Sequence, residues 1–310
     1  MEDKKEKTEG LFKVRSYLGC LDEGIKLPTR NFLVLLRFLS PSLLFGAVVA
    51  LGVAGLCGPM LTAVAEGDWA GVWLWGHALC LLWLLCLCVC WAQLSVAASC
   101  YMRTSSLGGL RLKSSGKELF GALGRACLVL GALWGVFALV ANGVFFAASR
   151  LWHVVLLLPA VLLVLGCALG VPYRMTVCDY LLNPQHTFVQ SLARLRDGYR
   201  NWGAFFALLL CCAFLWLVIM LAGSLPFGVL LEVKYRAMQA VAMGDAADLP
   251  AAFPVLLGAS AVAGAAVAGI AQWLMFFPQV FLYGSVETGR KEREHYEAEE
   301  QLYESSRKKF

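Results

Sequence analysis

Four cysteines lie close together in the segment CLLWLLCLCVCW, residues 80–91, at a spacing that raises the question of metal or redox chemistry. In a helix, where each residue turns by about 100°, Cys86 and Cys90 share a face and the other two thiols point elsewhere. Such a set cannot surround one tetrahedral ion, whose ligands usually come from turns such as C-x2-C. One alternative stays open, a site between helices in which Cys86 and Cys90 meet Cys211 or Cys212. Otherwise these thiols act as small apolar groups.

Signatures of catalysis are scarce. Ser224, within MLAGSLPFG, is similar to the serine of intramembrane proteases, but the last apolar segment has no histidine to serve as its base. The sequence has no HExxH, no glycine-rich phosphate loop and no pair of intramembrane aspartates. The four histidines are scattered, so a four-histidine iron centre is not expected. We therefore predict no catalytic residue, no metal site and no cofactor.

Polar residues inside apolar segments are the best pointers to function, because each costs free energy unless it is paired or hydrated. On one side of the expected membrane, three such residues could cluster around a small polar cavity: His77, Asn142 and His153. On the other side lie Gln93, Arg125 and Gln272. Taken singly, each could instead make one hydrogen bond to a neighbouring helix.

The composition indicates a membrane protein. Of the 310 residues, 60% are apolar and 15% are charged, and the mean hydropathy is +0.70, whereas a soluble domain has about 25% charged residues. The surroundings expected for such a chain are membrane lipids and not nucleic acid. The first apolar run begins only near Phe32, too late for a cleaved secretory signal, so we expect the first span to be retained.

Six apolar segments are long enough to cross the hydrocarbon, which takes about 20 residues. Their expected bounds are 32–58, 70–101, 119–148, 151–172, 203–231 and 254–283. The predicted fold is an all-α polytopic transmembrane helix bundle of about six spans, with interfacial amphipathic helices on the cytoplasmic side. The expected division is a charged and amphipathic N-terminal segment (1–31), the bundle (32–283) and a charged tail (284–310).

The positions of the basic residues predict the orientation, because lysine and arginine resist translocation. With six spans, 23 of these residues fall on the side of the termini and only 3 on the other. Both termini are therefore expected in the cytoplasm. On this division Asp179 and Asp197 fall in loops, and no span holds an acidic residue deep in the membrane, which disfavours an ion-coupled transporter.

Three stretches before spans 1, 3 and 5 have an amphipathic pattern, clearest in HTFVQSLARLRDGYRNW and in GLFKVRSYLGCLDEGIKL. Basic residues of these stretches and of the following helix starts are expected at the membrane interface: Arg37, Arg125, Arg194, Arg196 and Arg200. The order of amphipathic stretch, outward helix and inward helix suggests a threefold repeat. The alternative is that any outward helix tends to begin with a basic residue.

Small residues line one side of the last span, in LGASAVAGAAVAGIA, where Ser260, Gly264 and Ala268 recur every four positions. This spacing lets helix backbones approach closely, so we expect the span to be central in the bundle. Gly131 and Gly135 offer a second such face. After the last span, residues 284–310 carry charges of both signs four residues apart, which favours a solvated helical tail.

The sequence resembles a family of six-span bacterial inner-membrane proteins, the YciC group, and the membrane domain found beside glycerophosphodiester phosphodiesterases. The likeness is carried by LDEGIKLPTRNFLVLLRFLSPSLL, FVQSLARLRDGYRNWGAFFALLL and FPQVFLYGSVETGRK. It implies an inner-membrane location and no particular activity. The function expected first is a non-enzymatic structural, assembly or regulatory role, with a membrane-protein partner or a second copy of the chain. The alternatives are a transporter or lipid-handling protein and, third, an intramembrane enzyme.

Overall fold

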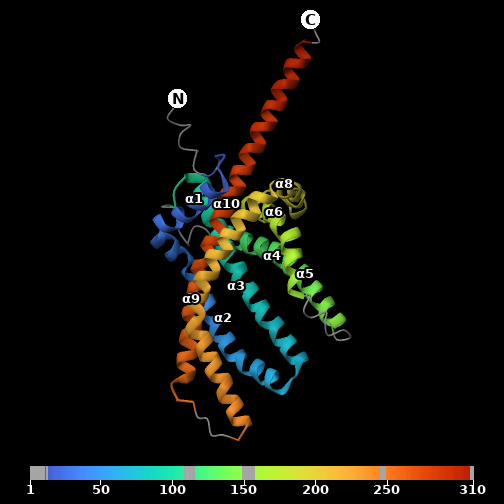
Figure 1. Ribbon diagram of the computed structural model, residues 1–310. Helices are drawn as coiled ribbons and strands as arrows, with labels where there is room; N and C mark the ends of the chain where they lie inside the picture. Colours follow the sequence, from blue (N-terminus) through green and yellow to red (C-terminus); the bar gives the residue numbers. More distant parts are fainter. Residues whose placement is uncertain are drawn as a thin grey trace.

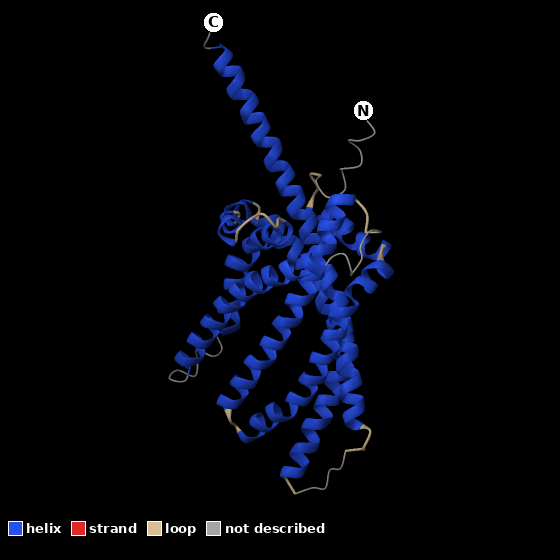
Figure 2. Ribbon diagram, turned by 180° about the vertical axis from the view of Figure 1, so that it is seen from behind, coloured by secondary structure: helices blue, strands red, loops and turns tan. Residues whose placement is uncertain are grey.

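The computed structural model describes residues 11, 13–107, 110, 116–148, 158–244 and 249–307. Within these residues every regular element is a helix and no strand is present (Figure 2). Six helices are long and apolar enough to cross a membrane, so the predicted all-α polytopic bundle is confirmed. The elements are α1 (Tyr17–Arg30), α2 (Phe32–Glu66), α3 (Trp69–Thr104), α4 (Gly116–Ala148), α5 (Leu158–Leu165), the π-helical turn η4 (Gly166–Gly170), α6 (Val171–Leu182), α7 (Phe188–Ala193), α8 (Leu195–Arg200), α9 (Trp202–Ala242) and α10 (Phe253–Arg307).

The long helices form three antiparallel pairs, α2 with α3, α4 with α5, and α9 with α10 (Figure 1). At one end of the bundle, the terminal face, lie α1, α7, α8 and the projecting end of α10. At the opposite end, the hairpin face, α2 turns into α3. Figure 1 shows the three pairs diverging from the terminal face toward the hairpin face.

The fourth span differs from the expected bounds of 151–172. Helix continues from Leu158 through η4 and α6 to Leu182, so the prediction that Asp179 lies in a loop is wrong. The segment VPYRMTVCDYLL stays helical because most of its side chains are apolar and can be buried among other helices, and nine of its twelve residues are buried. Arg174 and Asp179 are thereby brought inside the bundle.

The π-helical turn η4 shifts the backbone hydrogen bonds and leaves carbonyl groups free for other donors. Two side chains from the α8–α9 region use them. The Tyr199 hydroxyl donates to the Ala168 carbonyl at 2.9 Å, and the Trp202 indole donates to the Cys167 carbonyl at 2.8 Å. These bonds attach the start of α9 to the fourth span.

The junctions before the first and fifth spans are built alike, which supports the repeat for these two units. Asn31 stands between α1 and α2 with φ −114° and ψ 27°, and Asn201 stands between α8 and α9 with φ −108° and ψ 22°. The side-chain Nδ2 of each asparagine donates to the backbone carbonyl four residues earlier, at 3.0 Å for Asn31 and 2.9 Å for Asn201. In the corresponding stretch of the second unit, residues 108–109 and 111–115 lie outside the described residues.

Helix α1 closes the bundle by packing against α10. A Cβ atom on Gly24 would lie 2.6 Å from the backbone of Pro278, so only glycine permits this approach. Just before α1, the backbone amide of Arg15 donates to the Ser285 hydroxyl at 2.8 Å. Residues from the two ends of the chain therefore form one continuous contact, which we call the closing contact.

The last span is central, as expected from its small residues. Helix α10 touches α1, α2, α3, α6 and α9. A Cβ on Gly223 of α9 would meet Val267 at 2.5 Å, and one on Gly269 would meet Leu43 of α2 at 2.6 Å. Beyond Tyr283 the helix runs on to Arg307, where Glu287 pairs with Lys291 and Arg290 with Glu294, each four residues apart. Glu287, however, is buried and not solvated.

Candidate functional site

A cavity of about 550 Å³ lies between the α2–α3 pair and the α9–α10 pair. We call it the slot. It is lined from α2 by residues within 42–53, from α3 within 79–90, from α9 within 220–227, from α10 within 261–272, and by Trp134 of α4. None of the lining residues is charged. The volume falls within the roughly 300–1,000 Å³ of small-molecule sites.

The slot is long and lies toward the hairpin face. At 1.5 Å per residue, its α2 wall from Ser42 to Val53 extends about 17 Å along the helix. Its end nearer the terminal face is marked on α10 by Gln272, which is about 16 Å along the helix from Tyr283. The slot therefore occupies the half of the spanning bundle that is farther from the terminal face.

Small residues create this space while also holding the helices together. Gly264 and Ala268 of α10 and Gly46 of α2 line the slot. A Cβ on Gly46 would meet nothing within 4 Å, whereas one on Gly264 would contact the Gly223 carbonyl at 3.6 Å. The small faces predicted to serve packing alone thus also form the wall of a cavity.

Three polar side chains other than thiols and tryptophan indoles reach the slot. The hydroxyls of Ser42 and Ser224 each donate to a carbonyl of their own helix, at 2.8 and 2.6 Å. Gln272, with 6% of its surface exposed, accepts at Oε1 from the Trp91 indole at 3.2 Å. Because an indole N–H can only donate, this bond fixes the amide orientation and leaves Nε2 with no hydrogen-bond partner among the described residues.

A positive charge lies behind this pair. The Arg174 guanidinium stacks over the Trp91 ring, 5.4 Å from its centroid. Its Nε is buried with no hydrogen-bond partner in the described part of the chain. Arg174 is therefore a cation inside the bundle, and its guanidinium makes a cation–π contact with the Trp91 ring.

The cysteines of the 80–91 segment fall in different surroundings from those of the fifth span. Cys86 and Cys90 line the slot, whereas Cys212 is buried near Arg174. All twelve cysteines are free thiols. Among the described residues, no three His, Cys, Asp or Glu are placed to hold a metal ion.

The structure brings two of the three residues of the expected polar cavity together. His77 Nε2 lies 3.3 Å from the Asn142 amide nitrogen, and the Trp73 indole donates to Asn142 Oδ1 at 3.0 Å. The third residue, His153, lies outside the described residues. Neither His77 nor Asn142 lines the slot, so this group bridges α3 and α4 beside it.

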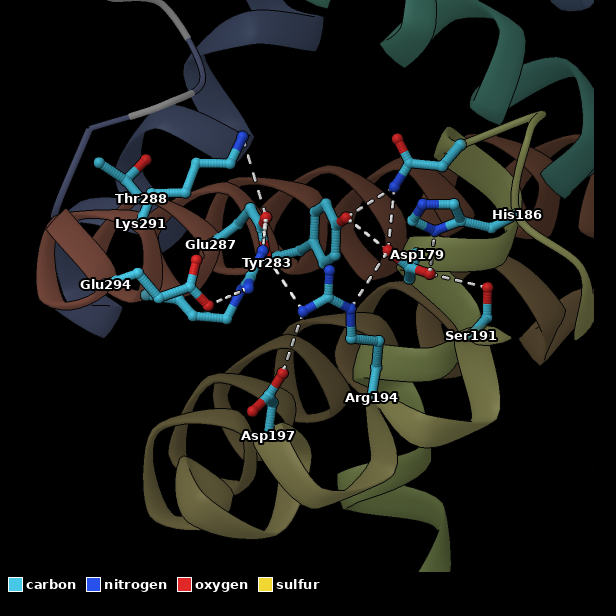
Figure 3. Close-up of polar contacts among 12 residues, drawn as sticks. Asp179, His186, Ser191, Arg194, Asp197, Tyr283, Glu287, Thr288, Lys291 and Glu294 are labelled. Atoms are coloured by element: carbon cyan, nitrogen blue, oxygen red, sulfur yellow. Dashed lines mark hydrogen bonds and ion pairs between the residues drawn. The ribbon is translucent and has the colours of Figure 1, made fainter. Parts of the chain in front are cut away.

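A second polar cluster centres on Asp179, which is fully buried near the terminal face (Figure 3). Its Oδ1 accepts from the Tyr283 hydroxyl at 2.8 Å and from Asn183 at 2.9 Å. Its Oδ2 accepts from His186 Nδ1 at 2.8 Å and from the Ser191 hydroxyl at 2.7 Å. We call this group the Asp179 joint, because it links α6, α7 and α10.

The geometry of the Asp179 joint argues against catalysis. A carboxylate has about four acceptor positions, and four donors already occupy them. The Ser191 hydroxyl donates to Asp179 and not to His186, so the arrangement is not a nucleophile–base–acid triad. Arg194 extends the joint: it lies 3.9 Å from Asp179 and 3.7 Å from Glu287. Figure 3 shows its guanidinium among the carboxylates from three helices.

The five arginines expected at the interface divide into two groups. Arg37, Arg196 and Arg200 are exposed. Arg125 donates to the Tyr180 carbonyl at 3.4 Å, and Arg194 pairs with acidic groups as described above. Two of the five therefore also join helices to one another.

Comparison of the chain with protein-family models, with curated proteins and with solved structures found no match. The resemblance to the YciC group stays a prediction.

Sequence reasoning missed Asp179 and Arg174 as interior residues. The signal was present, because the apolar positions of the fourth span continue past Pro172 to Leu182 with only these two charges among them. Asp179 was assigned to a loop, and Arg174 falls beyond the expected end of the fourth span at residue 172. Gln272 was correctly placed inside a span, but its partner Trp91 and the slot depend on tertiary packing.

Proposed function

We propose that this chain is a non-enzymatic, multi-pass membrane protein that binds a membrane lipid in the slot. The observation that carries the proposal is an uncharged, mostly apolar cavity of about 550 Å³ within the spanning part of the bundle. Lipid chains are the apolar molecules that surround such helices. The length of the slot, about 17 Å, is close to half of the ~30 Å hydrocarbon core. The slot is therefore about as long as a lipid chain that extends through one leaflet.

The proposed location is the cytoplasmic (inner) membrane of a bacterial-type cell, with both termini in the cytoplasm. The segregation of 23 basic residues against 3 supports this orientation. Apolar side chains exposed near the terminal face support amphipathic contact with the interface: Leu18 of α1 is 56% exposed and Val189 of α7 is 75% exposed. The slot would then lie in the outer leaflet.

Filling the slot tests the proposal. Gly46→Leu places a branched side chain where the wall is open, so bound lipid is expected to fall by about tenfold or more, the change to which ~1.4 kcal/mol corresponds. Gly52→Leu is the matched control, since Gly52 is on the same helix, also has nothing within 4 Å, and does not line the slot. The measurement is native mass spectrometry after extraction without detergent exchange. Equal lipid occupancy in both variants would refute the proposal.

A second candidate is the assembly role, which one observation favours. Helix α10 continues about 36 Å beyond Tyr283, and its residues from Lys291 to Gln301 are exposed. A charged helical rod of this kind could contact a partner or a second copy of the chain. Crosslinking in the native membrane tests this role, and a strictly monomeric protein without crosslinked partners would exclude it.

A further inference from the structure

We infer that the lipid bound in the slot is a neutral one with a carbonyl oxygen that accepts a hydrogen bond from Gln272 Nε2. The inference rests on the proposed lipid-binding function and specifies the class of lipid. Prenyl quinones and diacylglycerols share this chemistry.

The first observation is the amide itself. Gln272 is 94% buried, since 6% of its surface is exposed, and it lines the slot. No hydrogen bond of Nε2 to another described residue is present, and Nε2 is not one of the fully buried unpartnered side-chain atoms, so it keeps some exposed surface at this lining residue. Trp91 holds the carbonyl end, so the two N–H groups of Nε2 are the ones left to meet a ligand.

The second observation is that the slot selects an acceptor. The hydroxyl protons of Ser42 and Ser224 are already donated to backbone carbonyls. Behind Gln272, the positive charge of Arg174 lies over the Trp91 ring. Both the free amide donor and this nearby cation favour an electron-rich oxygen at the Gln272 end of the slot.

The third observation is depth, which excludes a charged headgroup at this point. Gln272 lies about 16 Å along α10 from Tyr283, close to the middle of a ~30 Å hydrocarbon core. No lining residue carries a charge that could pair with a phosphate or carboxylate. An ion is costly at that depth, whereas a ketone or ester oxygen is tolerated.

Two variants separate the effect of the Gln272 Nε2 donor from the effect of the Trp91–Gln272 hydrogen bond. Gln272→Met keeps the length and flexibility of the side chain but removes the donor, and it also breaks the bond to Trp91. Trp91→Phe breaks the same bond while leaving the amide in place. Gln279→Met controls for loss of a buried amide from α10, because Gln279 is 2% exposed and does not line the slot.

The experiment reconstitutes the delipidated full-length protein with one probe at a time and measures adducts by native mass spectrometry. The probes are a benzoquinone with one prenyl chain, a diacylglycerol and a phosphatidylglycerol. We expect a neutral probe to bind, with affinity about three- to tenfold weaker in Gln272→Met, the effect of one net hydrogen bond. Gln279→Met should stay within about twofold of the parent protein, whereas Trp91→Phe, which keeps the amide donor but no longer fixes its orientation, should weaken binding less than Gln272→Met does.

The outcomes distinguish the two proposals. If only phosphatidylglycerol binds and Gly46→Leu abolishes it, the inference that the bound lipid is neutral is overturned while the slot still binds lipid. Equal weakening in Gln272→Met and Trp91→Phe would also overturn it, because the shared loss would then be structural. If no probe binds, or if Gly46→Leu changes nothing, the lipid-binding function itself is refuted.

Discussion

Asp179→Ala is expected to lower the free energy of unfolding by about 3–5 kcal/mol, the range measured when one partner of a buried charged network is removed. Asp179 is fully buried and accepts four hydrogen bonds, two on each oxygen. Alanine would leave the buried Tyr283 and Ser191 hydroxyls without this acceptor, and each unsatisfied group adds its own cost. The measurement is reversible unfolding in detergent or bilayer discs.

Two further variants make this prediction specific to the Asp179 joint. Asp197→Ala removes a carboxylate that is 29% exposed and pairs with the same Arg194, so it should cost about 1 kcal/mol or less. Asp179→Asn keeps the shape and one acceptor oxygen, and should fall between the two. Equal effects of Asp179→Ala and Asp197→Ala would show that the joint does not stabilise the bundle.

Gly24→Ala is expected to destabilise the closing contact, with a net loss of about 1–2 kcal/mol. The new methyl group would lie 2.6 Å from the Pro278 backbone, which cannot move as a flexible side chain would. Overpacking of this kind costs about 1–3 kcal/mol, and the better helix propensity of alanine offsets up to about 1 kcal/mol of it. Gly19→Ala on the same helix meets no atom closer than 3.5 Å and should be neutral or stabilising.

Cys20 provides a local readout of the same contact. It is fully buried, and burial raises the pKa of its thiol to about 11, against the lowering effect of the nearby Arg15 charge. Since the thiolate is the reactive form, Cys20 should resist maleimide at neutral pH. Gly24→Ala should accelerate labelling of Cys20 relative to Cys100, measured by peptide mass spectrometry. Unchanged labelling together with unchanged stability would contradict the role assigned to Gly24.

The number of spans and their antiparallel order could be predicted from the sequence, because each span is an apolar run bounded by charges. The same rule failed at Arg174 and Asp179. A charged residue is placed in water by its own transfer free energy, but here Trp91 stacks on one charge and four donors surround the other. Those partners come from other helices, so no local pattern could have revealed them.

The candidate site was less predictable than the fold. The small residues of the last span indicated close packing, and Gly223 against Val267 confirms it. A small-residue face specifies where backbones approach but not where they separate again. The slot arises because the α2–α3 and α9–α10 pairs diverge toward the hairpin face, and that divergence depends on the angles between helices from distant parts of the chain.

The closing contact also sets an order for biosynthesis. The Arg15 amide and the Ser285 hydroxyl that it reaches are 270 positions apart. At about 5–20 residues per second, tens of seconds separate the synthesis of the two. During that interval α1 has no α10 to pack against, and Gly24 lacks its contact with Pro278. Completion of the bundle is thus coupled to insertion of the last span, because the contact that α1 makes with α10 cannot form before that.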